Sequence, residues 1–153
     1  MANILNANDL TPVELVRASR YPRLRYMGSK YKVLPYLTGL LANLPFDTAL
    51  DAFSGSGVVA YALKEMGKEV TTNDFLRFPA TVAKAVVENG HEILSEDDVA
   101  LLLSPNRDQR SFIRDTFSGL YFPSEDHEFL DAAWSHLQGL SPAKQALAIS
   151  AMC

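Results

Sequence analysis

The chain has 153 residues, of which 48% are hydrophobic and 21% charged, and its formal net charge is −4. This composition is typical of one folded domain with a core and excludes a disordered chain. No apolar run reaches the roughly 20 residues of a membrane helix, and the N-terminus lacks the layout of a signal peptide. The one cysteine, Cys153, excludes a disulfide framework or a cysteine metal site within one chain. We therefore predict a cytoplasmic protein without a metal.

The charge is unevenly distributed along the chain. Six basic residues and no acidic residue lie between Arg17 and Lys32, whereas eight basic and fifteen acidic residues follow from Asp51 onward. This pattern predicts that residues 1–23 form a basic N-terminal arm and that one edge of an acidic protein faces phosphate. Tyr21 and Tyr26 are interleaved with the arginines, so we interpret this segment as the better candidate for contact with nucleic acid.

Helices and strands are predicted to alternate in the first part of the chain. Apolar residues at helical spacing predict an amphipathic helix over 30–44 that ends before Pro45. A strand over 48–53, a helix over 57–66, a second strand over 69–74 and a helix from Phe78 to Asn89 follow. This order with short links indicates half of a doubly wound α/β sheet.

The chain beyond Gly90 is predicted to be helical. Ser95 to Asp98 has the pattern of a capping box before a helix over 99–103, and further helices are expected over 107–117, 125–138 and from 142 onward. Ser124 and Ser141 are expected to cap the helices over 125–138 and from 142 onward. In the helix over 125–138, the side that carries Asp126, His127 and Glu128 is expected to be exposed. We therefore divide the chain into the arm, an α/β part over 24–92 and a helical insertion or subdomain over 93–153.

The stretch from Asp51 to Gly57, with the sequence DAFSGSG, is predicted to join the first strand to the helix after it. Two glycines allow positive φ angles and close approach of a ligand to the backbone. The helix that follows directs its free N–H groups and its positive dipole end into the turn. The turn therefore suits an anionic or polar cofactor, although Ala60 stands where a dinucleotide motif has its third glycine.

Two segments of the chain resemble a known family. DAFSGSG resembles the first signature of methyltransferases that use S-adenosylmethionine, and Tyr26-Met27-Gly28-Ser29-Lys30 resembles the segment that precedes it in Dam-like adenine-specific (N6) DNA methyltransferases. The resemblance implies a Rossmann-like fold, S-adenosylmethionine as cofactor, double-stranded DNA as partner and a role in DNA methylation or restriction–modification. Lys30 would pair with the methionine carboxylate, Asp74 with the ribose hydroxyls and Phe75 with adenine. The predicted cofactor-binding residues are Tyr26, Gly28, Lys30, Asp51, Phe53, Gly55, Gly57, Asp74 and Phe75.

The family's catalytic signature, an Asp, Asn or Ser followed by two prolines and an aromatic residue, is absent because no two prolines are adjacent in the chain. We therefore predict no catalytic residue here and expect the chain to be the N-terminal part of a longer enzyme whose catalytic loop lies beyond Cys153. The helical region would then begin the target-recognition region. The alternative is a non-catalytic helical interaction module on a vestigial nucleotide-binding fold, and a third interpretation is methylation of RNA or a small molecule.

Three arginines, Arg107, Arg110 and Arg114, have the spacing of one helical face and are candidates for contact with DNA phosphates. Asp108 and Asp115 lie close to them in the sequence. We therefore favour a solvated helix face with local ion pairs.

Overall fold

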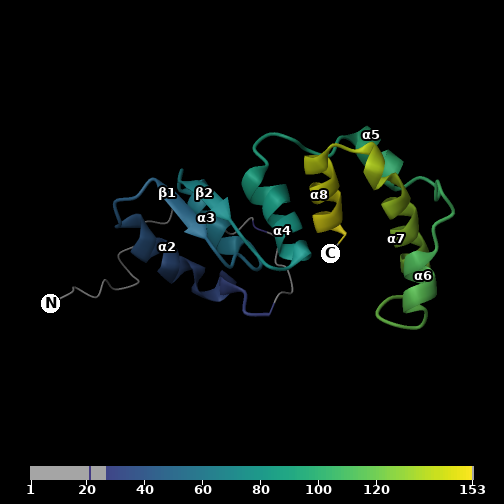
Figure 1. The fold of residues 1–153 in the computed structure, drawn as a ribbon, viewed down its shortest axis with the longest axis horizontal. Coiled ribbons are helices and arrows are strands. Elements are labelled where there is room, and N and C mark those ends of the chain that lie inside the picture. Colours follow the sequence, from purple (N-terminus) through teal and green to yellow (C-terminus); the bar gives the residue numbers. More distant parts are fainter. Residues whose placement is uncertain (1–20, 22–26, 153) are drawn as a thin grey trace. The chain divides into compact units, whose positions relative to one another are not determined.

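The structure is a computed structural model that describes residue 21 and residues 27–152. The chain divides into two compact units, residues 1–90 and residues 91–153 (Figure 1). The predicted basic arm, apart from Tyr21, and Tyr26 lie outside the described residues.

The first unit alternates helices and strands, as predicted. The 3-10 turn η2 (Lys30–Val33) leads into helix α2 (Leu34–Ala42). Pro35 occupies the first turn of this helix, where a residue without a backbone N–H is tolerated. Gly67 has a φ angle of +78° and follows the C-cap residue of helix α3 (Val58–Glu65), as a C′ glycine does. The further elements are β1 (Thr48–Asp51), β2 (Glu69–Thr72), α4 (Arg77–Ala83) and the π-helical turn η3 (Lys84–Glu88).

β1 and β2 form a parallel two-stranded sheet in which Thr48 pairs with Glu69 and Asp51 pairs with Thr72. Helix α3 connects them, so these elements form a βαβ unit (Figure 1). Both strands end two residues earlier than predicted. Because parallel strands end at the same edge, the glycine turn after β1 lies beside the residues that follow β2.

The core of the first unit lies around α3. Its buried residues are Tyr21, Leu34, Val58, Ala62 and Val82. The burial of Tyr21, which is 3% exposed, corrects our interpretation of this side chain as a contact for nucleic acid. Its ring packs against Tyr61 because a tyrosine buries a large apolar ring when its hydroxyl finds a partner.

The second unit is helical, as predicted. The capping box of Ser95 and Asp98 is present, and Ser141 caps the last helix by accepting from the Lys144 amide. Ser124, in contrast, is the first residue of its helix, and Pro123 precedes it without a capping bond. The elements are α5 (Glu96–Leu102), α6 (Phe112–Phe117), α7 (Ser124–His136), η4 (Leu137–Gly139) and α8 (Pro142–Ala151), and a core cluster contains Leu102, Leu137, Leu140 and Ala148.

Two further expectations about the helical unit are wrong. Helix α6 begins at Phe112 because the Asn106 side chain bonds both the amide and the carbonyl of Arg110, at 3.0 and 2.6 Å, and closes a separate turn. Helix α7 buries His127, which we expected to be exposed and which is 1% exposed, whereas its neighbours Asp126 and Glu128 are exposed as expected. The His127 ring bonds the Leu120 carbonyl at 3.1 Å, which provides a partner for a buried polar group.

Candidate functional site

The chain turns sharply between Ser54 and Gly57. Gly55 and Gly57 have φ angles of +51° and +76°, in the left-handed region that other residues rarely enter. The Gly57 amide donates to the Ser54 carbonyl at 2.7 Å, and Gly57 is the N-cap residue of α3. Both predicted glycines therefore shape the turn that connects β1 to α3.

Asp74 connects this turn to the end of β2. Its Oδ2 accepts a hydrogen bond from the Gly55 amide at 2.8 Å, and its Oδ1 accepts one from the Leu76 amide at 2.9 Å. These amides, that of Leu76 first, hold the pKa of Asp74 below its usual value because they stabilise the carboxylate. Each oxygen keeps a second lone pair, so a carboxylate placed in this way can still accept a bond from a ligand hydroxyl.

A pocket of about 490 Å³ lies between the upstream segment (residues 27–30), the glycine turn and Asp74. This volume is within the range of small-molecule sites. Six of the nine predicted cofactor-binding residues line it, and they come from segments separated by up to 46 positions in the sequence, from Gly28 to Asp74. They are Gly28, Lys30, Asp51, Phe53, Gly55 and Asp74.

The other three predicted residues differ in position. Gly57 directly follows the lining residue Ser56, does not itself line the pocket, and is the N-cap residue of α3. Phe75 is 97% exposed and does not line the pocket, whereas Phe53 lines it while 88% exposed. Tyr26 lies outside the described residues.

Three serines that were not among the predicted site residues line the pocket: Ser29, Ser54 and Ser56. Ser29 Oγ and Ser56 Oγ lie 3.2 Å apart and form a hydrogen bond between the upstream segment and the turn. Lys30 Nζ donates to the Gly28 carbonyl at 3.1 Å within the same segment. The sequence feature that could have predicted these serines is their position next to glycines in both motifs, since serine hydroxyl groups commonly form hydrogen bonds with the backbone of turns.

Within the part of the chain that the structure describes, two buried polar atoms at the pocket have no hydrogen-bond partner, Asp51 Oδ2 and Ser54 Oγ. Ser54 is only 8% exposed. Burial raises the pKa of Asp51, the amides of Phe53 and Ala60 counteract this, and the charge of Asp74 adds to the rise. Because a buried polar atom without a partner is costly, these atoms indicate a place for a ligand donor or cation.

Residues 26–134 match the family of D12 class N6 adenine-specific DNA methyltransferases. The chain belongs to this family. The predicted resemblance is thereby confirmed, and the match extends from the pocket residues into the helical unit. Over 136 residues the chain is 32% identical to the type II methyltransferase M2.HphI of Haemophilus parahaemolyticus, an alignment that covers 87% of this chain and 39% of that protein. The chain thus spans about two fifths of the length of this curated relative. No solved structure matches the chain.

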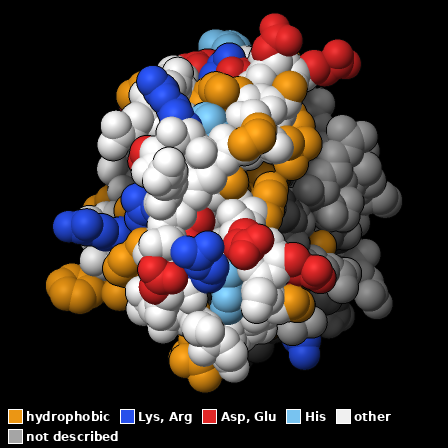
Figure 2. Space-filling view, turned by 90° about the vertical axis from the view of Figure 1, so that its right-hand side faces the viewer, with side chains coloured by type: hydrophobic (Ala, Val, Ile, Leu, Met, Phe, Trp, Pro, Cys, Tyr) orange, Lys and Arg blue, Asp and Glu red, His pale blue; other side chains and the backbone are white. Residues whose placement is uncertain are grey.

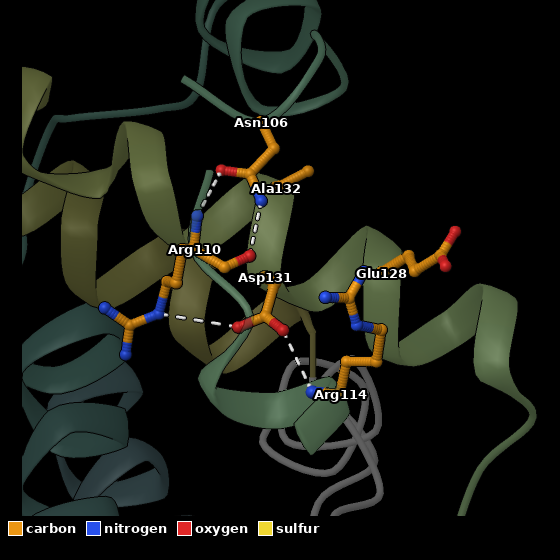
Figure 3. A pocket seen from close by; sticks show the side chains of 6 residues that line it. All are labelled: Asn106, Arg110, Arg114, Glu128, Asp131 and Ala132. Atoms are coloured by element: carbon orange, nitrogen blue, oxygen red, sulfur yellow. Dashed lines mark hydrogen bonds and ion pairs between the residues drawn. The ribbon is translucent and has the colours of Figure 1, made fainter. Parts of the chain in front are cut away.

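The helical unit of this D12 class chain has a second pocket, of about 360 Å³, which contains two of the predicted arginines (Figure 3). The buried Asp131 lies at its centre: Arg110 Nε is 3.5 Å from this carboxylate, which also accepts from the Arg114 amide at 2.9 Å. The Arg114 side chain pairs with Asp115 at 3.3 Å. Arg110 and Arg114 thus both have acidic partners. The three predicted arginines do not form a single helical face, because α6 begins at Phe112, after Arg110.

Acidic and basic side chains are interspersed on the face drawn in Figure 2. Among the described residues, no group of three or more His, Cys, Asp or Glu side chains is arranged to hold a metal ion. In that part of the chain, no helix has both the length and the apolar character needed to cross a membrane.

Proposed function

We propose that this chain binds S-adenosylmethionine in the pocket at the glycine turn and belongs to an enzyme that methylates the N6 amino group of adenine in duplex DNA. The observation that carries the proposal is that Lys30 and Asp74 line one pocket with the glycine turn between them. Family membership supports it. The βαβ unit would be part of a Rossmann-like sheet, with residues 24–92 as the cofactor part and 93–153 as the beginning of target recognition.

The pocket residues fit the groups of this cofactor. Lys30 would pair with the methionine carboxylate, Asp74 would accept from the ribose hydroxyls, and Phe53 or Phe75 would contact adenine. Gly55 and Gly57 allow close approach, and the unpartnered Asp51 Oδ2 suits the positively charged end of the ligand. When bound, S-adenosylmethionine supplies a methyl group activated on a sulfonium ion.

We further propose that methyl transfer requires residues outside these 153. The family's catalytic signature is absent from them, and the relative M2.HphI is much longer than the matched region. By analogy with that type II methyltransferase, the whole protein would act in restriction–modification. Sequencing the gene around this segment tests the point, because an Asp-Pro-Pro-aromatic codon series is expected in the same reading frame.

Titration calorimetry with S-adenosylmethionine tests the cofactor site. Lys30→Ala and Asp74→Ala should each weaken binding about tenfold or more, because each removes a charge-assisted contact. Lys32→Ala and Asp47→Ala are matched controls, since both residues are exposed and neither lines the pocket. Unchanged affinity in both pocket variants would rule out this placement, and a wild-type chain that does not bind the cofactor would favour the non-catalytic interaction module.

A further inference from the structure

We propose that Tyr21 is a positioning residue of the cofactor pocket, whose hydroxyl holds the Ser56–Gly57 peptide in the orientation that the pocket requires. The inference rests on the proposed function, because it assigns to Tyr21 an effect on the affinity for S-adenosylmethionine. Tyr21 itself does not line the pocket.

The Tyr21 side chain lies directly behind the glycine turn. Its hydroxyl donates a hydrogen bond to the Ser56 carbonyl, although the two residues are 35 positions apart. Its ring centroid lies 5.1 Å from that of Tyr61, at an interplanar angle of 50°. A Cβ atom at Gly57 would lie 3.0 Å from the Tyr21 hydroxyl oxygen. The hydroxyl and the turn are therefore in contact, and a Cβ atom at Gly57 would force the hydroxyl to shift by a few tenths of an ångström.

The carbonyl end of the peptide between Ser56 and Gly57 is held by a partner outside the turn. Glycine tolerates both signs of φ, so a peptide bond next to it can turn over at little steric cost. In this structure the two ends of the peptide are held separately: the Gly57 amide donates to the Ser54 carbonyl, and the Ser56 carbonyl accepts from Tyr21. Since Tyr21 belongs to the buried core around α3, the carbonyl points into the core and not into the pocket.

Ser56 is also fixed on its other side. Its hydroxyl bonds Ser29 Oγ at 3.2 Å, and Ser29 is the pocket residue next to Lys30. One turn residue thus contacts both Tyr21 and the upstream segment. We infer that this junction sets the distance between Lys30 and the acidic side of the pocket.

Tyr21 can act as a donor over the whole range of physiological pH. Burial raises the pKa of its hydroxyl to about 12, and the neighbouring Tyr61 adds to the rise. The hydroxyl therefore keeps its proton, and its bond to Ser56 does not depend on pH within that range.

Tyr21→Phe in the full chain tests the proposal, because it removes the hydroxyl and keeps the ring. Tyr36→Phe makes the same chemical change at a half-exposed position of α2 and is the control. We expect the affinity of Tyr21→Phe for S-adenosylmethionine to fall about tenfold under conditions where circular dichroism shows both variants fully folded. Ser29→Ala, which breaks the second contact of Ser56, should weaken binding in the same direction.

Amide hydrogen exchange without cofactor supplies a second readout. Exchange at Gly57, relative to Ala62 within α3, should become about tenfold faster in Tyr21→Phe and stay unchanged in Tyr36→Phe. If the wild-type chain binds the cofactor and the folded Tyr21→Phe variant binds it with the same affinity, the inference is overturned. Unchanged relative exchange at Gly57 would overturn it even if no chain binds the cofactor, a result that would count separately against the proposed function. An unfolded Tyr21→Phe variant would also overturn it, in favour of a role in folding alone.

Discussion

The amide of Gly55 donates to the Asp74 carboxylate at 2.8 Å, across 19 positions of sequence. This bond joins the turn after β1 to the segment after β2, and the same carboxylate accepts from the Leu76 amide before α4. Asp74 is thus both a structural acceptor and a lining residue of the candidate pocket. The two roles are compatible, because each carboxylate oxygen that accepts from an amide keeps a second lone pair.

Asp51→Asn is expected to make the free protein more stable at neutral pH and to weaken its affinity for S-adenosylmethionine. The pKa of Asp51 is raised, mainly by burial, so its charged form destabilises the folded state. This destabilisation is absent below the unfolded value of about 4 and grows as the pH rises through the folded pKa. Urea denaturation at pH 3 and pH 7 checks it: the variant should gain stability over wild type only at the higher pH, and an equal gain at both would contradict this origin.

Gly57→Ala is expected to cost about 2–3 kcal/mol of unfolding free energy in the wild type and about 1 kcal/mol less in a Tyr21→Phe background. The cost has two parts, the positive φ of +76° and the contact of the new Cβ with the Tyr21 hydroxyl. Removing the hydroxyl relieves only the second. A double-mutant cycle by denaturation measures the difference, and additive effects would show that the contact carries no free energy.

Asp131→Ala should destabilise the helical unit by about 2–5 kcal/mol. Asp131 is 1% exposed and accepts from the amides of Ile113 and Arg114 at 3.0 and 2.9 Å, so its loss leaves two part-buried donors without their acceptor. Glu128→Ala on the same helix is the control, since this exposed side chain should change stability by no more than about 0.5 kcal/mol. The fluorescence of Trp134, the chain's one tryptophan, reports the unfolding of this unit, and equal midpoints for both variants would contradict the assignment.

The Asp98–Lys144 ion pair should make the helical unit sensitive to acid. The two side chains lie 2.6 Å apart, and Lys144 first, then Ser95, lowers the pKa of Asp98 to about 2. The stabilisation is complete above the unfolded value of about 4 and is lost as the pH falls towards 2. Lys144→Met should therefore lose less stability than wild type between pH 4 and pH 2 when Trp134 fluorescence is followed. Parallel losses in the two proteins would show that the pair is not the cause.

Local sequence determined the elements and the turn of this protein. Apolar periodicity predicted α2 and α3, apolar and β-branched residues predicted the strands, and the capping box of Ser95 and Asp98 predicted the beginning of α5. These signals depend on neighbours in the chain. The family was also predictable, since its two motifs are short and contiguous.

Only the tertiary structure decided which residues come together and which face inward. Asp74 meets the glycine turn because parallel pairing brings the ends of β1 and β2 to the same edge, and Lys30 lines the same pocket from η2, whereas Phe75 points to solvent. Tyr21 and Asp131 are both buried, because each has a hydrogen-bond partner far away in the sequence. The partner is the Ser56 carbonyl for Tyr21 and the Ile113 amide for Asp131. Residue type predicts an exposed carboxylate; distant backbone donors make burial favourable, and only the fold supplies them.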